Sequence, residues 1–303
     1  MHPGLSSRVV TLICWAVTLA TTSTAFAGPA TLYWTDLDYG RIERMNVDGT
    51  GRTTVVAGLT TPTNVAIDLA GDKLYWAAWR PKCIQRANLD GSNVETIVGT
   101  GLLDPLGLAL DAGAGKLYWV DPLLHALQRA NLDGSGVETV LANLQNPIGL
   151  ALDPVDGKLY WSDTGANKIC RANIDGSNVE TLISSGLEGP THVAIDHAGG
   201  HLYWVDRDLG CLGRSNLDGT AATTLISGVT WPEGLALDPL AGKLYWGSKL
   251  EDTIWRANLD GTGVEPFITT GLSYPYGLAL IPEPAAITAI ALFLALGARL
   301  PRR

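Results

Sequence analysis

The chain has 303 residues, 46% of them hydrophobic, which is enough for one large domain or two medium ones with a substantial buried core. Its 30 acidic and 21 basic residues give a formal net charge of -9, and without the charged residues of the two chain ends the balance is 29 to 17, or -12. Because binding to nucleic acid or anionic lipid depends on Lys and Arg, this composition argues against nucleic acid as a partner and limits membrane contact to the terminal segments.

Residues 1–27 have the pattern of a secretion signal. Arg8 precedes an apolar run at residues 9–20, and a polar stretch then leads to Ala25-Phe26-Ala27, the small-x-small pattern that a signal peptidase accepts. The apolar run of twelve residues is shorter than the roughly 20 needed to span a bilayer as a helix. We therefore predict cleavage near Ala27 and export of the remaining chain.

A repeat organises the body of the chain. Tyr-Trp pairs begin at positions 33, 75, 118, 160, 203 and 245, with spacings of 42, 43, 42, 43 and 42 residues. A period of about 40 to 45 residues with short apolar runs and Gly-rich turns is typical of one four-stranded propeller blade. The repeat therefore predicts an all-β fold, a six-bladed β-propeller.

The second repeat shows the four expected strands. They are residues 64–68, 73–76, 83–89 and 94–98, separated by turns that contain Gly71-Asp72 and Asp90-Gly91. The runs are apolar on both faces rather than alternating, as a sheet packed between two neighbouring sheets requires.

The first and last segments of the repeat region together contain the strands of one blade. The first repeat begins almost directly at Tyr33-Trp34 and lacks an inner strand, whereas residues 274–281 match the inner-strand pattern but no Tyr-Trp pair follows them. We therefore predict that strand 274–281 closes the first blade, which also removes open sheet edges. The predicted organisation is a signal at 1–27, a propeller at 28–281 and a tail at 282–303.

These motifs resemble the YWTD, or LDL-receptor class B, propeller family. Residues 33–36 carry the namesake motif Tyr-Trp-Thr-Asp in full, and all six repeats contain Asn-x-Asp-Gly, as at residues 46–49 and 258–261. The resemblance covers about residues 31–281 and implies a binding module, as such propellers are in receptors. The EGF-like and cysteine-rich modules that accompany them there are missing from this sequence, so receptor signalling is not implied.

A charge pair recurs in four repeats, where an Asp precedes an Arg by eight residues. Across an antiparallel hairpin such a pair can face and stabilise each other by roughly 0.2 to 1 kcal/mol. We therefore predict a structural role for Asp36 with Arg44, Asp121 with Arg129, Asp163 with Arg171, and Asp206 with Arg214.

The tail resembles a PEP-CTERM sorting signal. Pro282-Glu283-Pro284 is followed by an apolar run at residues 285–298 and by Arg299, Arg302 and Arg303. The resemblance implies a bacterial protein that an exosortase-type enzyme processes at the inner membrane, with release or attachment at the cell surface. An ordinary C-terminal anchor is the alternative.

Catalytic motifs such as G-x-S-x-G, H-E-x-x-H and a P-loop are absent from the sequence. Two alternative sets of residues could supply ligands to calcium or another divalent cation. Alternating carboxylates before Gly give Asp36, Asp38, Asp206 and Asp208, but without the later ligands of a calcium loop. The second set, which we place at corresponding positions of three inner strands, is Asn64, His192 and Glu233.

Aromatic residues distinguish one face of the ring. In this architecture, the loops before the inner strands and those joining second to third strands surround the same channel mouth. Their aromatic residues concentrate over three consecutive blades, and we expect a ligand there to contact Asp38, Tyr39, Trp79, Arg80, Trp231, Glu233, Tyr274 and Tyr276. The alternative is that these rings plug the channel mouth and pack against the closing strand. Because strand 274–281 runs directly into the tail, we also expect the aromatic residues to lie beside that join.

Three functions remain open from the sequence. The first is a cell-surface or extracellular-matrix module that binds a protein, a peptide or a polysaccharide. The second is a metal-dependent hydrolase or lactonase with its site at the channel mouth, as in gluconolactonase-type propellers. The third is a structural matrix protein without a discrete ligand.

Overall fold

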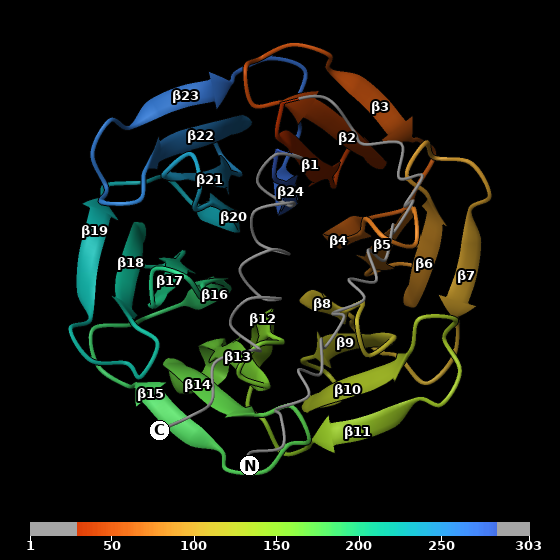
Figure 1. The fold of residues 1–303 in the computed structure, drawn as a ribbon, viewed down its shortest axis with the longest axis horizontal. Helices are drawn as coiled ribbons and strands as arrows, with labels where there is room; N and C mark the ends of the chain where they lie inside the picture. Colours follow the sequence, from red (N-terminus) through yellow and green to blue (C-terminus); the bar gives the residue numbers. More distant parts are fainter. Residues whose placement is uncertain (1–28, 284–303) are drawn as a thin grey trace, which may run out of the picture.

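The computed structural model describes residues 29–283, which form six four-stranded antiparallel sheets arranged as blades around a central axis (Figure 1). This confirms the predicted six-bladed β-propeller. The helical content of the described range is one 3-10 turn, η1 (Thr164–Ala166), and no helix there is long and apolar enough to cross a membrane. The predicted secretion signal and the predicted tail beyond Glu283 lie outside the described residues.

Each blade runs from an inner strand beside the axis to an outer edge strand. Blade 1 contains β24 (Pro275–Ile281), β1 (Thr31–Asp36), β2 (Arg41–Asn46) and β3 (Thr53–Val56). Blade 2 contains β4 (Pro62–Asp68), β5 (Lys73–Ala78), β6 (Cys83–Asn88) and β7 (Glu95–Val98). Blade 3 contains β8 (Leu108–Asp111), β9 (Lys116–Asp121), β10 (Ala126–Asn131) and β11 (Glu138–Leu141).

The other three blades repeat this pattern. Blade 4 contains β12 (Pro147–Asp153), β13 (Lys158–Asp163), β14 (Lys168–Asn173) and β15 (Glu180–Ile183). Blade 5 contains β16 (Pro190–Asp196), β17 (His201–Asp206), β18 (Cys211–Asn216) and β19 (Thr223–Ser227). Blade 6 contains β20 (Pro232–Asp238), β21 (Lys243–Ser248), β22 (Thr253–Asn258) and β23 (Glu265–Ile268).

The ring closes within blade 1, as predicted. Strand β24 pairs antiparallel with β1, so that Thr31 lies opposite Ile281 and Trp34 lies opposite Leu278. The same strand packs on β20 of blade 6 and on β4 of blade 2. The last described strand therefore joins the first and last blades of the ring.

The repeated Tyr-Trp pair builds the core between blades. Consecutive strand residues point to opposite faces of a sheet, so the Tyr faces the next blade and the Trp faces the previous one. Each of the six buried clusters accordingly joins a Tyr of one blade to the Trp of the next: Tyr33 with Trp76, Tyr75 with Trp119, Tyr118 with Trp161, Tyr160 with Trp204, Tyr203 with Trp246, and Tyr245 with Trp34. All twelve rings are at most 5% exposed, so the pair explains why each blade is apolar on both faces.

The predicted facing of the Asp and Arg pairs is wrong. Asp36 lies opposite Arg41, and Arg44 lies opposite Tyr33, because the turn between the second and third strands contains only four residues. The same register holds for the other three pairs, Asp121 with Arg129, Asp163 with Arg171, and Asp206 with Arg214. The aspartates instead accept hydrogen bonds from backbone N–H groups of nearby loops; Asp206, for example, accepts from Glu188, Gly189 and Leu209.

The arginines connect neighbouring blades. Arg171 donates to the backbone carbonyl of Leu217 in the next blade at 2.9 Å and forms an ion pair with Glu180 in its own blade. Arg86 bonds Leu132 and Glu95 in the same way, and Arg256 bonds Val47 and Glu265. The bond from Arg256 to Val47 joins blade 6 to blade 1, the last blade to the first.

Candidate binding site at the channel mouth

Two sets of loops share one face of the ring, which we call the connection face. Because strands alternate in direction within each blade, the loops that precede the inner strands lie on the same side as the turns from second to third strands. Backbone hydrogen bonds join the two sets, such as Trp79 N–H to the Thr61 carbonyl and Lys249 N–H to the Trp231 carbonyl, each at 3.1 Å. The connection face therefore gathers the residues that the sequence predicted for ligand binding.

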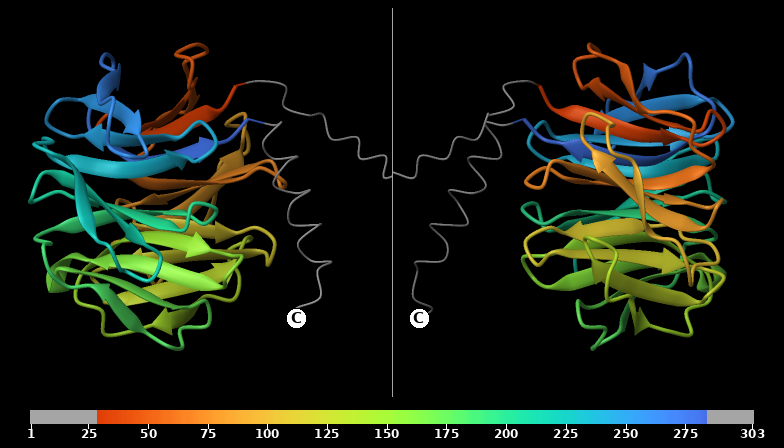
Figure 2. Two further views of the ribbon diagram at one scale, coloured as in Figure 1. Left: turned by 60° about the vertical axis from the view of Figure 1, so that its left-hand side comes forward. Right: turned by 90° about the vertical axis from the view of Figure 1, so that its right-hand side faces the viewer.

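The described ends of the chain lie on the opposite face. Strand β24 begins at the connection face and ends at Ile281, which lies opposite Thr31 at the start of β1 (Figure 2). At about 3.3 Å per residue, the strand separates Tyr276 from Ile281 by roughly 17 Å. The prediction that the aromatic residues lie beside the join with the tail is therefore wrong, because the strand carries the two to opposite faces.

One charged residue lies at the inner rim of the connection face. The residues after the proline that begins or precedes each inner strand are Thr63, Leu106, Ile148, Thr191, Glu233 and Tyr276, and Glu233 alone among them is charged. Its side chain is buried, with 0% residue exposure. Counted from the preceding proline, Glu233 corresponds to Thr191, one residue before the position of His192 and Asn64, whereas the strand register places His192 and Glu233 opposite the corresponding residues Val205 and Gly247.

The carboxylate of Glu233 makes no hydrogen bond in the described structure, although both oxygens are buried. Its nearest cation is Arg207, whose Nη1 lies 3.6 Å from Oε1. His192 Nδ1 lies 3.4 Å from Oε2, but this nitrogen accepts the Gly234 N–H at 3.1 Å and so has no proton for the carboxylate. A buried carboxylate without hydrogen bonds is costly, typically several kcal/mol, which makes Glu233 a candidate contact for a ligand.

Aromatic rings surround this carboxylate. Tyr276 makes edge contacts with His192 at 5.3 Å and with Tyr274 at 5.5 Å between ring centroids. Burial raises the pKa of Tyr276 well above its ordinary value, and the nearby charge of Glu233 raises it further. Tyr276 is therefore a neutral hydroxyl that can donate or accept at neutral pH.

Trp231 forms the exposed part of the site. It is 43% exposed, and its ring lies 5.5 Å from the guanidinium of Arg207 and 5.2 Å from Lys249 Nζ. The same ammonium lies 4.2 Å from the ring of Tyr274. The φ angles of Trp231 and Tyr274 are 42° and 62°, a conformation that is an outlier for bulky residues and that persists only where surrounding structure holds it.

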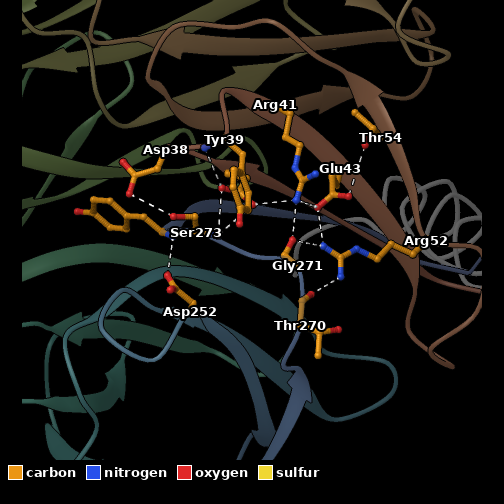
Figure 3. A network of polar contacts seen from close by, with 12 residues as sticks. Asp38, Tyr39, Arg41, Glu43, Arg52, Thr54, Asp252, Thr270, Gly271 and Ser273 are labelled. Atoms are coloured by element: carbon orange, nitrogen blue, oxygen red, sulfur yellow. Dashed lines mark hydrogen bonds and ion pairs between the residues drawn. The ribbon is translucent and has the colours of Figure 1, made fainter.

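Asp38 and Tyr39 belong to a polar network that joins blade 1 to the loop before β24 (Figure 3). The backbone N–H groups of Leu37 and Asp38 donate to the carbonyls of Tyr274 and Ser273 in that loop. The hydroxyl of Ser273 donates to Asp38 at 3.3 Å, and the 57% exposed ring of Tyr39 lies 4.7 Å from the guanidinium of Arg41. Arg41 and Arg52 both pair with Glu43 and both donate to the Gly271 carbonyl. This network holds the loop that positions Tyr274.

Trp79 and Arg80 form a separate exposed pair on blade 2. Trp79 is 42% exposed, and the Arg80 guanidinium lies 5.4 Å from its ring. Their backbone is fixed through Thr61. Among the described residues, no ring–ring or cation–π contact joins either side chain to Trp231 or Tyr274. The structure thus brings together Trp231, Glu233, Tyr274 and Tyr276, with Asp38 and Tyr39 adjacent, and leaves Trp79 and Arg80 apart.

The proposed metal ligands are engaged elsewhere or separated. Asp36 and Asp206 accept backbone N–H groups, Asp38 accepts from Ser273, and Asp208 pairs with Arg207 at 3.1 Å. Of the second set, His192 and Glu233 meet, whereas Asn64 lies on blade 2, beyond the closing strand. Neither set therefore forms a cluster of converging ligand atoms.

Sequence reasoning missed two features. The first is the pair of cations Arg207 of blade 5 and Lys249 of blade 6, which directly follow the second strands, at the same loop position as Trp79 of blade 2. The second is His197, whose Nδ1 lies 2.8 Å from the buried carboxylate of Asp153 and 3.9 Å from Asp156. Within residues 29–283 these three form the one group of His, Cys, Asp or Glu side chains spaced to hold a metal ion.

Comparison with known proteins identifies the family to which the repeat belongs. Residues 72–112, 115–154, 157–197 and 200–239, together more than half of the chain, match the low-density lipoprotein receptor repeat class B. Low-density lipoprotein receptor-related protein 1 of Pyricularia oryzae is 34% identical over 79 residues, which are 23% of this chain and 26% of that protein. Low-density lipoprotein receptor-related protein 5 of Mus musculus is 35% identical over 65 residues, 20% of this chain and 4% of that protein. The chain thus spans about a quarter or less of these relatives.

A solved structure shows the same fold. A chain in the crystal structure of a nidogen/laminin complex superposes with a TM-score of 0.78 and 24% identity, over 83% of this chain and 98% of that one. At this identity the similarity establishes the propeller architecture alone. The four matched segments cover more than half of the chain, so the chain belongs to the family of low-density lipoprotein receptor class B repeat proteins.

Proposed function

We propose that this chain is an exported binding module that recognises a protein or peptide at the channel mouth, over blades 5, 6 and 1. The observation that carries the proposal is the exposed ring of Trp231, which contacts Arg207 and Lys249, while the same Arg207 lies beside the buried carboxylate of Glu233. Trp, Tyr and Arg contribute most to binding energy in protein interfaces, and such anchors are surrounded by groups that exclude water.

The relatives support a protein partner over other ligands. The similar solved structure is a complex of nidogen with laminin, and the curated relatives are receptor-related proteins. Each of the three exposed aromatic residues also lies next to a cation: Tyr39 with Arg41, Trp79 with Arg80, and Trp231 with Arg207 and Lys249. A polysaccharide is the alternative ligand that the same rings would stack against.

We also propose that residues 1–27 direct export and that residues 282–303 form a PEP-CTERM tail cleaved by an exosortase-type enzyme. The tail would leave from the face opposite the channel mouth, so that a surface-attached propeller presents its binding site outward. Mass spectrometry of the C-terminal peptide of the mature protein tests the processing. Recovery of an intact end at Arg303 would refute cleavage.

Selection from a phage-displayed library of linear twelve-residue peptides tests the binding proposal. The selected peptides should bind the purified wild-type protein, and Trp231→Ala should weaken that binding at least tenfold. The matched control is Leu240→Ala, because Leu240 is 57% exposed in the turn between β20 and β21 on the opposite face.

Two outcomes would reject the peptide reading. One is a library that yields no binder, and the other is a set of binders that Trp231→Ala leaves unaffected. If Leu240→Ala weakens binding instead, the site lies on the opposite face. Unchanged thermal unfolding of both variants would show that the binding effects are local.

A further inference from the structure

Buried polar atoms without partners concentrate at the channel mouth. Among the described residues, eight buried side-chain atoms lack a hydrogen bond, and four of them belong to Asp104, Thr191 and Glu233. Glu233 contributes both carboxylate oxygens, Asp104 contributes Oδ1, and Thr191 contributes its hydroxyl. Three of the four atoms are therefore carboxylate oxygens, which only accept hydrogen bonds when ionised.

The neighbours of Glu233 do not fill its acceptor capacity. Arg207 is too distant for a hydrogen bond at 3.6 Å, and it already pairs with Asp208 at 3.1 Å. His192 directs its Nδ1 lone pair at Gly234 N–H, and Tyr276 contacts His192 through its ring. Native proteins pair nearly all buried polar groups, so two bare oxygens on one carboxylate indicate an absent partner.

The partner must be a cation to offset a desolvated carboxylate. A neutral donor would satisfy a lone pair, but burial penalises the negative charge itself, and a nearby positive charge compensates for it most directly. The aromatic rings of Trp231, Tyr274 and Tyr276 on the approach also favour positive charge over their faces. Lys249 shows this preference within the chain, since its ammonium lies over both Trp231 and Tyr274.

We infer that the partner of the channel mouth inserts a basic side chain, lysine or arginine, whose cation pairs with Glu233. Arg207, whose side chain is 30% exposed, would move outward to admit this cation, and its contacts with Asp208 and the Trp231 ring do not involve Glu233. Thr191 in β16 of blade 5 and Asp104 in the loop before β8 of blade 3 carry further unpaired oxygens on the connection face. This inference rests on the proposed function, because it names the chemistry of the segment that the channel mouth would recognise.

An NMR titration of the full chain tests the inference, with the backbone amide of Gly234 as the reporter. Its N–H donates to His192 beside Glu233, so it senses an incoming cation. The probes are the peptide Ac-Gly-Lys-Gly-NH2, the same peptide with its lysine acetylated, and calcium chloride. The acetylated peptide retains an N–H donor and removes only the charge.

The lysine peptide should shift the Gly234 signal in a saturable way, and the acetylated peptide should bind at least tenfold more weakly. Glu233→Gln should weaken the lysine peptide at least tenfold, whereas Glu188→Gln, which changes an exposed carboxylate in the loop before β16, should not. Arg207→Ala should strengthen binding, because it removes the resident cation, and it provides a second test if Glu233→Gln folds poorly.

Equal binding of the two peptides, or full binding by Glu233→Gln, would overturn the inference. A saturable response to calcium without one to the lysine peptide would assign the site to an inorganic cation and would also overturn it. These failures are distinguishable from failure of the proposed function. Library-selected peptides that need Trp231 but tolerate Glu233→Gln would leave the binding module standing and remove only the basic side chain.

Discussion

Arg207 and Glu233 form an ion pair without a hydrogen bond. Their closest atoms, Nη1 and Oε1, are 3.6 Å apart, and the carboxylate is buried while the guanidinium is partly exposed. The negative charge is therefore desolvated but only partly compensated. Such an arrangement lowers the stability of the free protein and leaves binding energy available to a ligand.

Glu233→Gln should therefore stabilise the free protein. The neutral amide removes the cost of the buried charge while keeping the shape of the side chain, so we expect the free energy of unfolding to rise by about 1 to 3 kcal/mol. Urea unfolding at pH 7 measures the change, with Glu188→Gln expected within about 0.5 kcal/mol of wild type. A lower stability for Glu233→Gln would show that the carboxylate is well compensated.

The stability of the connection face should depend on pH through Asp104. Burial, and secondarily the charge of Asp121, raises the pKa of Asp104 from 3.8 to about 6. The folded chain then binds the proton more tightly than the unfolded chain, so this group favours folding at low pH and loses that contribution as pH rises through about 6.

Asp104→Asn removes this titration. The difference in unfolding free energy between the variant and wild type should favour the variant more at pH 7.5 than at pH 4.5. Urea unfolding of both proteins at both pH values measures it. An equal stability difference at the two pH values would mean that Asp104 titrates normally in the folded protein.

The arginines between blades should contribute mainly through their backbone contacts. Arg86 donates to the Leu132 carbonyl of the next blade and pairs with Glu95, whose side chain is 52% exposed. Arg86→Ala should lower the free energy of unfolding by about 1 to 3 kcal/mol, because it leaves a partly buried carbonyl unpaired. Glu95→Ala should cost less than about 1 kcal/mol, since exposed ion pairs contribute little. Equal losses in the two variants would assign the effect to the ion pair instead.

The inner strands approach too closely for a side chain at Gly277. A Cβ there would lie 2.4 Å from the Thr63 carbonyl oxygen of blade 2. Gly277→Ala should therefore destabilise the protein by about 1 to 3 kcal/mol through overpacking at the ring closure. Gly113→Ala is the control, because its nearest neighbour would be a side-chain oxygen at 3.5 Å. Thermal unfolding should show a lower Tm for Gly277→Ala alone; equal Tm values would contradict this close contact.

The fold could be predicted from the sequence because the repeated residues form the contacts between consecutive blades. The six Tyr-Trp pairs give the number of blades. Because Tyr and Trp point to opposite faces of each sheet, the pairs also indicate the core between blades. Because the first repeat lacks an inner strand, the sequence also predicted that residues 274–281, which contain β24, close blade 1. The facing of Asp36 and Arg44 failed because it depends on turn length, and four turn residues place Arg41 opposite Asp36.

The site was only partly readable, because its central contacts join different blades. Trp231, Glu233, Tyr274 and Tyr276 were predicted from the asymmetry of the loops, and their proximity follows from adjacent positions in blades 6 and 1. The approach of His192 and Arg207 to Glu233 depends on packing between blades 5 and 6. Residue spacing does not encode that packing, and neither does it encode the contact between His197 and Asp153.

The most direct test of the central claim is an amide chemical-shift map of the protein with a library-selected peptide. We predict that the perturbed amides cluster at the channel mouth, around Trp231, Gly234, Lys249 and residues 274–276. Perturbations confined to the opposite face, such as the turn at residues 154–157, would contradict a binding site at the channel mouth.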